Sequence, residues 1–209
     1  MRRSRARSSS ATRARSVPRP ERGGAAALLV PLETERLRLE PIRPDHADAM
    51  FEGLHDPALY TYQSDEPPAS RRELRERYAR LARGLSPSGE QHWLNWIIVP
   101  RDAGTAAGYV QATVEDDRSW AKIGYLVLPA YQRRRFGGEA VAAMVQHLAA
   151  SGIRAVEAVI DTRNTPSISL IERLGFERRA TRRSDDVIGG ARGLDHEYIL
   201  KIPEAGGAG

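Results

Sequence analysis

The stretch Gln132-Arg-Arg-Arg-Phe-Gly-Gly138 joins a predicted strand to a predicted helix. The strand is the apolar segment that ends at Leu128, and the helix is indicated by apolar residues spaced i, i+3, i+4 and i+7 over 141–148. Backbone N–H groups in such a turn, together with the positive end of the following helix, form a site for an anion such as a pyrophosphate. Strand–glycine–helix turns are common, so this stretch alone names no particular ligand.

A second stretch, Asn164-Thr-Pro-Ser-Ile-Ser-Leu-Ile-Glu-Arg-Leu-Gly-Phe176, repeats the arrangement. The apolar pattern before it predicts a strand over 155–161 that ends at Asp161. Pro166 stands at the start of the next predicted helix, and Gly175 ends that helix. Two strand–turn–helix units therefore follow one another between residues 120 and 176.

Outward from these units, the pattern predicts one mixed α/β domain. Leu37 and Leu39 alternate with charged residues and predict a first strand, and Ser70 with Glu73 forms a capping box at a helix start. The other predicted elements are helices over 44–54 and 70–83, an antiparallel meander of strands over 93–99, 107–114 and 120–128, and a final antiparallel pair over 176–182 and 196–201.

The basic charge of the chain lies mostly in its first 24 residues. The chain has 32 Lys and Arg, 27 Asp and Glu and a net charge of +5, but eight Arg and one acid lie in residues 1–24, so the remainder carries −2. Apart from Met1, Val17 is the only large apolar residue of that segment, too little to offset the entropy of ordering it. We expect residues 1–30 to be a disordered Arg/Ser/Ala-rich tail, residues 31–203 to form the domain, and residues 204–209 to be flexible.

Three interpretations of the tail remain: an extension without function, which we favour, a contact with nucleic acid or the ribosome, and a targeting segment. The absence of cysteine excludes disulfides, thiolate nucleophiles and Cys-ligated zinc. No apolar run approaches the roughly 18 residues that span a bilayer, so we expect a soluble, cytoplasmic and, from the Arg- and Ala-rich composition, bacterial protein. The histidines lack metal-ligand spacing and we expect no metal site; they are His46, His55, His92, His147 and His196.

Several short motifs occur in the order and at the separations found in the GCN5-related N-acetyltransferase (GNAT) family. The chain resembles the ribosomal-protein-alanine-acetyltransferase-like (RimJ/RimL-type) branch over residues 32–202. The resemblance implies an α+β fold with a mixed, mostly antiparallel sheet of about seven strands, splayed fourth and fifth strands, and about four helices. The matching residues are Glu33-Thr-Glu-Arg-Leu-Arg-Leu39, Asp56-Pro57, Ile123-Gly-Tyr125, the loop 132–140, Asn164 with Ser167, Leu174-Gly-Phe176 and Asp195-His196.

The resemblance also implies direct transfer of an acetyl group from acetyl-CoA to a primary amine. An N–H near Leu126 would polarise the thioester carbonyl, and Asn164 would hydrogen-bond the pantetheine arm. The other residues that the resemblance assigns to acetyl-CoA are Leu126, Val127 and Leu128 along the arm, and the amides of Arg133, Arg134, Arg135, Phe136, Gly137 and Gly138 around the pyrophosphate.

The chain departs from the family pattern at two positions. Arg135 replaces a loop glycine, and it either adds a cation beside the phosphates, which we favour, or weakens cofactor binding. Lys122 stands where many relatives carry a glutamate that serves as general base. A lysine accepts a proton only if burial lowers its pKa from about 10.4, so a solvated lysine is the favoured interpretation.

The proton-transfer groups therefore stay open. Ser167 is the candidate acid for the CoA thiolate, and the alternative is a first-turn serine that satisfies a backbone N–H. The candidates for the base other than Lys122, which the sequence does not rank, are Asp161, His196, Glu66 and Glu115.

The expected acceptor is the α-amine of a protein or peptide N-terminus, or a small-molecule amine. Loops 61–70 and 84–92 are predicted to wall its site, and their acids Asp65, Glu66 and Glu90 suit a cationic substrate. Arg135 and Lys122 motivate one rival, a non-catalytic acyl-CoA-binding module. The tail motivates another, a nucleic-acid or ribosome binder, which we disfavour. We expect no membrane partner, and a homodimer stays open.

Overall fold

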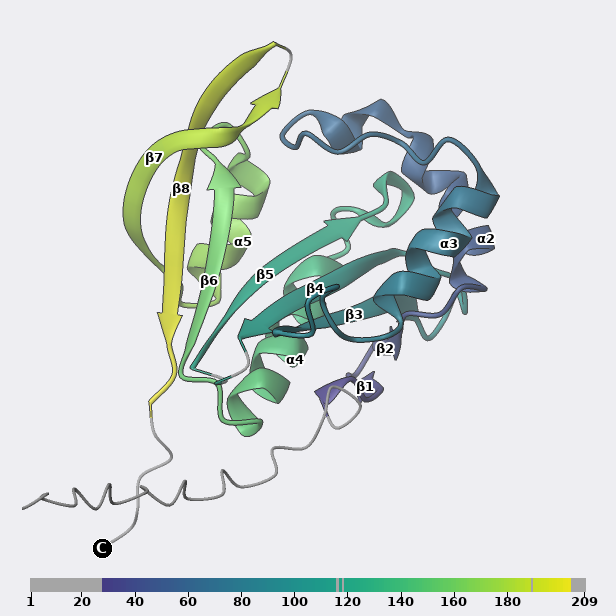
Figure 1. The fold of residues 1–209 in the computed structure, drawn as a ribbon, viewed down its shortest axis with the longest axis horizontal. Coiled ribbons are helices and arrows are strands. Elements are labelled where there is room, and N and C mark those ends of the chain that lie inside the picture. The colour runs from purple at the N-terminus through teal and green to yellow at the C-terminus, as the bar shows by residue number, and fades with distance from the viewer. Residues whose placement is uncertain (1–27, 116, 118, 189, 204–209) are drawn as a thin grey trace, which may run out of the picture.

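The computed structural model of the chain describes residues 28–115, 117, 119–188 and 190–203. In these residues eight strands form one sheet, in the order β1-β2-β3-β4-β5-β6-β8-β7 (Figure 1). Every neighbouring pair is antiparallel except β5 and β6, which are parallel. The expected mixed, mostly antiparallel sheet is confirmed, with eight strands in place of about seven.

The strands are β1 (Leu32–Glu33), β2 (Leu37–Pro41), β3 (Gln91–Pro100), β4 (Gly108–Glu115), β5 (Trp120–Val127), β6 (Ala155–Asp161), β7 (Glu177–Ile188) and β8 (Ala191–Lys201). The helices are α2 (His46–Phe51), α3 (Arg71–Leu81), α4 (Phe136–Ala150) and α5 (Thr165–Arg173). Short 3₁₀ turns cover Gly53–His55, Pro57–Tyr60 and Pro129–Tyr131.

Alternate residues of β3 enter two hydrophobic clusters, one on each face of the sheet. Trp96 and Ile98 belong to the cluster that α4 and α5 cover, whereas Ile97 and Val99 belong to the cluster that α2 and α3 cover (Figure 1). Successive side chains of a strand point to opposite faces, so the continuous apolar run of β3 reflects burial on both sides.

The folded domain begins earlier than the predicted boundary at residue 31. Leu28 is 2% exposed and packs in the cluster under α4. Its carbonyl accepts a 2.6 Å hydrogen bond from Nε2 of His147, and the carbonyl of Val30 accepts a 2.7 Å bond from Nε1 of Trp96. Residues 28–30 therefore pack on the domain. The predictions for residues 1–27 and 204–209 lie outside the described residues.

Three predicted elements differ from those observed. The helix predicted over 44–54 is α-helical only in α2, and the chain then forms two 3₁₀ turns. The second turn is capped by Asp56, whose side chain accepts a 2.9 Å bond from the N–H of Ala58. The strands predicted over 176–182 and 196–201 are longer, because they continue into the β7–β8 hairpin. The added residues of β7 are mostly exposed and polar, so no alternation marks them in the sequence.

Across the described ranges, no helix combines the length and the apolar composition that crossing a membrane requires. In the same ranges, no three His, Asp or Glu side chains are grouped closely enough to hold a metal ion. The absence of a metal site stays a prediction.

Candidate active site

The strands β5 and β6 pair over only half of their length. Their parallel pairing ends at Ile123 with Ala158, and Gly124–Val127 have no pairing with β6. From that point the two strands diverge (Figure 1). These are the splayed strands that the resemblance implies.

The backbone of Leu126 faces β4 rather than the open side of β5. A Cβ atom on Gly108 would lie 2.1 Å from the carbonyl oxygen of Leu126, so this carbonyl points toward β4. The backbone N–H and C=O groups of successive residues in a strand point to alternate sides of it. Those of Tyr125 and Val127 therefore point to the open side of β5. There the Val127 carbonyl accepts a 3.0 Å hydrogen bond from Nε2 of Gln132. The backbone N–H groups near Leu126 on the open side of β5 are therefore those of Tyr125 and Val127.

The loop 132–138 enters α4 through two residues with positive φ. Arg133 has φ 61° and Arg135 has φ 65°, in the left-handed region that glycine adopts most readily. Arg135 is the N-cap of α4 and its side chain makes no capping hydrogen bond, so that side chain does not occupy the first N–H groups of the helix. Phe136 and Gly137 are buried, whereas a Cβ on Gly138 would have no atom within 4 Å. Arg133 and Arg135 thus adopt a backbone conformation that is typical of glycine.

Arg36, in the turn between β1 and β2, ties this loop to the sheet. Its Nε donates to Oε2 of Glu139 at 2.7 Å, and its backbone N–H donates to Oε1 at 3.0 Å. Its Nη1 donates to the carbonyl of Arg134 at 3.1 Å, and its Cζ lies 5.1 Å from the centroid of the Phe136 ring. Arg36 therefore contacts the loop on both sides of Arg135.

Glu139, in the first turn of α4, is the acidic partner in this contact. The hydroxyl of Thr34 donates to its Oε1 at 2.6 Å. Partial burial raises the pKa of Glu139, but the hydrogen bonds from Thr34 and Arg36 outweigh that effect and hold the pKa below its ordinary value. Because the folded-state pKa is lowered, the contact stabilises the fold above the ordinary glutamate pKa of about 4.3, and that stabilisation is lost as the pH falls through the lower value.

Replacing Arg135 by glycine should relieve backbone strain without removing the loop amides. We expect Arg135→Gly to be more stable than the neighbouring Arg134→Gly by about 1 kcal/mol, because both add the same chain entropy but only Arg135 has a positive φ. Its affinity for acetyl-CoA should stay within about tenfold of the natural chain's, or about 1.4 kcal/mol. Urea denaturation and calorimetric titration measure the two quantities. Binding that appears only in the glycine variant would show that the natural chain is a poor binder.

Asn164 and Ser167 lie at the start of α5. Oδ1 of Asn164 accepts a 3.2 Å hydrogen bond from the N–H of Ser167, so Asn164 is the cap of α5 and its amide NH₂ takes no part in that bond. The described residues offer the Ser167 hydroxyl no hydrogen bond. The Tyr125 hydroxyl donates to the Ser167 carbonyl at 3.2 Å, which joins β5 to α5, and burial raises the pKa of Tyr125.

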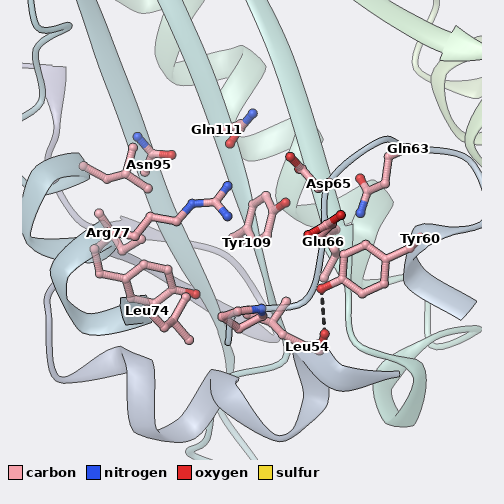
Figure 2. Close-up of a pocket in the computed structure, with 15 residues that line it drawn as sticks. Leu54, Tyr60, Gln63, Asp65, Glu66, Leu74, Arg77, Asn95, Tyr109 and Gln111 are labelled. Carbon is pink, nitrogen blue, oxygen red and sulfur yellow. Dashed lines mark hydrogen bonds between the residues drawn. The ribbon is translucent and has the colours of Figure 1, made fainter. Parts of the chain in front are cut away.

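A pocket lies between α3, the segment 60–68 and strands β3 and β4, with Leu126 of β5 in its wall. Its empty volume, counted out to its mouth, is about 500 Å³. Figure 2 shows Arg77 reaching in from α3 on one side, with Asp65 and Glu66 on the other. The remaining lining residues are Ile42, Leu54, Tyr60, Gln63, Pro68, Leu74, Tyr78, Leu81, Asn95, Tyr109 and Gln111.

Of the two loops predicted to wall the acceptor site, only 61–70 contributes to this pocket, and no residue of 84–92 does. The second loop instead folds back on the start of β3: the N–H of Trp93 donates to Gly84 and that of Ser86 to Gln91, both at 2.9 Å. Glu90 is therefore not part of this pocket, and its contribution to the acceptor site stays a prediction.

Glu66 is the one base candidate that lines the pocket. Asp161 is buried and accepts two hydrogen bonds from the side chain of Arg163, at 2.9 and 2.6 Å, which hold the pKa of Asp161 below its ordinary value. His196 is hydrogen-bonded to a threonine of β7, and Glu115 accepts a bond from a glutamine of β3. These three groups are engaged elsewhere.

Lys122 lies outside the pocket. It is exposed on the paired half of β5, opposite Thr113 of β4 and Glu157 of β6. Four residues of strand, on the order of 13 Å, separate it from Leu126. This position favours a solvated lysine over a base.

Two sets of side chains escaped the sequence analysis. Arg36 lies within the Glu33–Leu39 motif, but nothing local to that motif indicates a contact with residues 134–139. Arg77 and Tyr78 have helix periodicity and look like ordinary surface or core positions. Both sets are recognised by contacts between segments that lie far apart in the chain, and the sequence pattern does not show these contacts.

Known proteins share this architecture. The family model described as Acetyltransferase (GNAT) domain matches residues 36–177. The chain is 26% identical over 155 residues to the uncharacterized N-acetyltransferase YoaA of Bacillus subtilis (strain 168), covering 73% of this chain and 85% of that protein. Among solved structures, RimL, a ribosomal L7/L12 alpha-N-protein acetyltransferase in complex with coenzyme A, aligns with a TM-score of 0.73 at 20% identity, over 83% of this chain and 98% of that chain.

The microcin C7 self-immunity acetyltransferase MccE, solved with acetyl-CoA and AMP, also has a TM-score of 0.73, at 15% identity over 84% of this chain and 99% of that chain. At these identities the two structures establish the fold alone. The family match covers more than half of the chain and includes β2 to α5, with the splayed strands and the loop before α4. The chain is therefore an acetyltransferase of the GNAT family.

Proposed function

We propose that this enzyme transfers the acetyl group of acetyl-CoA directly to a primary amine of a protein N-terminus or a small molecule. The position of Leu126 carries the proposal, because Leu126 belongs both to the unpaired half of β5 and to the wall of the pocket. A donor held along the splayed strands and an amine held in the pocket would meet at this residue.

The residues around the splay fit acetyl-CoA. The amides of Arg133–Gly138, at the positive end of α4, suit the pyrophosphate. The outward backbone groups of Tyr125 and Val127, with Leu126 and Leu128 beside them, suit the amide-bearing pantetheine arm, as does the NH₂ group of Asn164. When bound, acetyl-CoA supplies a thioester carbonyl carbon as the acyl donor.

The reaction needs a proton acceptor and a proton donor. The amine nitrogen bonds to the acyl carbon and the C–S bond breaks, while the ammonium loses protons and the thiolate gains one. We assign the acceptor role to Glu66, because it lines the pocket without a hydrogen bond or ion pair to any described residue. Ser167 keeps the donor role, and Tyr125, whose hydroxyl lies at the Ser167 carbonyl, is a second candidate for it.

The finer placement in the RimJ/RimL-type branch belongs to this proposal. The Glu33–Leu39 motif and the fold shared with RimL support it. The bacterial relative YoaA supports a bacterial enzyme, for which we propose a cytoplasmic location.

Release of free thiol from acetyl-CoA, followed with and without a panel of primary amines, measures this activity. We expect release that depends on an amine, together with the matching mass increase of that amine. Binding of CoA by calorimetry without thiol release on any amine would instead identify a non-catalytic acyl-CoA-binding module.

Two conservative variants test which residue donates the proton to the CoA thiolate. We expect Ser167→Ala to lower kcat by about threefold to tenfold with unchanged affinity for acetyl-CoA, a modest loss because a thiol of pKa about 8.5 leaves readily even without an acid. Tyr125→Phe, which keeps the ring, should leave kcat within twofold. The opposite ranking would move the donor role to Tyr125, and an unaltered rate in Ser167→Ala would remove Ser167.

A further inference from the structure

Three charged side chains enter the pocket without a partner. Asp65, Glu66 and Arg77 make no hydrogen bond or ion pair with any described residue, although opposite charges share one small hollow. Elsewhere on α3 the pattern differs: Arg71 pairs with Glu52 at 2.5 Å, and Arg75 pairs with Asp48 at 2.6 Å. The pocket therefore keeps both signs of charge available.

The two signs of charge lie on opposite walls. Arg77 projects from α3 toward Tyr109, whereas Asp65 and Glu66 approach from the loop before α3 (Figure 2). Both walls act on the Tyr109 hydroxyl between them: its pKa is raised to about 12, chiefly by burial and then by Asp65, while Arg77 opposes the rise. A ligand that spans the hollow would meet a cation at one end and carboxylates at the other.

Neutral donors accompany the arginine. Tyr78 is 4% exposed and lines the pocket, and its hydroxyl has no hydrogen-bond partner among the described residues. Burial raises the pKa of Tyr78, so the hydroxyl keeps its proton. A buried hydroxyl without a partner costs free energy, which an accepting oxygen of a ligand removes. Tyr78 thus provides an independent indication that an oxygen-bearing group binds in this hollow.

We propose that the acceptor is a small zwitterion, an amino acid whose carboxylate is held by Arg77 and the tyrosine hydroxyls while Asp65 and Glu66 face its ammonium. This inference rests on the proposed acetyl transfer to an amine. The two charged walls complement a molecule that carries both charges within a few bonds. A protein N-terminus lacks a carboxylate next to its amine, so it would leave Arg77 without a partner.

Pairs of amines that differ only in whether they carry a carboxylate distinguish an amino acid acceptor from a protein N-terminus. Thiol release by the full chain is measured with glycine, β-alanine, 4-aminobutyrate and 6-aminohexanoate, each beside its primary amide, and with an alanine-rich pentapeptide amide. We expect at least one amino acid to exceed its amide tenfold in kcat/KM and to exceed the pentapeptide. The best member of the series reports the spacing between the two walls.

Arg77→Gln should reduce the acid-to-amide ratio of kcat/KM to about one, with the KM for acetyl-CoA unchanged. Arg80→Gln, an exposed arginine on the same helix that does not line the pocket, should keep the ratio. Asp65→Asn should lower kcat/KM for acids and amides alike, because the ammonium is common to both. A ratio near one in the natural chain, a preference for the pentapeptide, or a ratio that survives Arg77→Gln would overturn this inference alone. If none of the amines supported thiol release, the result would contradict the proposed function itself.

Discussion

Arg36→Met raises the KM for acetyl-CoA by about 30-fold while kcat stays within threefold. The expectation follows from the contacts that Arg36 makes to the carbonyl of Arg134 and to the carboxylate of Glu139, at either end of the loop that turns through Arg135. A charge-assisted hydrogen bond contributes about 1.5–3 kcal/mol, and about 2 kcal/mol of lost loop positioning corresponds to that change in KM. Steady-state kinetics with varied acetyl-CoA measure it.

The matched control is Arg101→Met. Arg101 pairs with Glu33 and donates to the Thr34 carbonyl at 3.1 Å, so it contacts the same turn as Arg36 without touching the loop. Its KM should change less than threefold. S-acetylpantetheine, which lacks the pyrophosphate, supplies a second readout, because Arg36→Met should leave kcat/KM for this donor unchanged. Equal losses with both donors, or equal losses in both variants, would show that Arg36 acts on overall stability instead.

Gly108→Ala lowers the free energy of unfolding by about 2–6 kcal/mol. Gly108 has φ +151°, which residues with a side chain rarely adopt, and its Cβ would lie 2.1 Å from the backbone carbonyl of Leu126. Strain of this kind costs about 1–3 kcal/mol, and the collision with backbone adds a further 1–3 kcal/mol because a backbone atom cannot rotate away. Urea denaturation measures the loss.

Gly104→Ala isolates the conformational part of this effect. Gly104 lies in the turn before β4 with φ +64°, and a Cβ there would have no atom within 4 Å. We expect it to cost about 1 kcal/mol, the ordinary penalty of a left-handed residue with a side chain. If the two variants lose the same amount, the approach of β4 to Leu126 is looser than the structure indicates.

The elements from α3 to α5 were predicted within a few residues because each has a clear period, a capping residue or a glycine at its end. The capping box at Ser70 is one example: its hydroxyl accepts a 3.1 Å bond from the N–H of Glu73. The prediction failed where those signals are missing. Polar residues on both faces hid the far part of β7, and a helix-like pattern before Asp56 concealed the 3₁₀ turn Gly53–His55.

In the candidate site, too, the parts made of neighbouring residues were predicted and the parts that depend on distant contacts were not. The loop before α4 and the helix start that follows Asn164 were identified because each is a run of neighbouring residues, and both stand where expected, while their contacts with acetyl-CoA remain predictions. The loop 84–92 lies outside the pocket because its hydrogen bonds return to β3, which charge and length do not reveal.

By itself the sequence determined the order of the elements, the two strand–turn–helix units and the loop whose amides suit an anion, because these depend on bonds between residues close together in the chain. Only the tertiary structure decided that Arg36 holds that loop, that Leu126 stands in both the splay and the pocket, and that Arg77 faces Asp65 and Glu66. Such contacts join separate segments through the packing of the helices on the twisted sheet, and no periodicity along the chain encodes them.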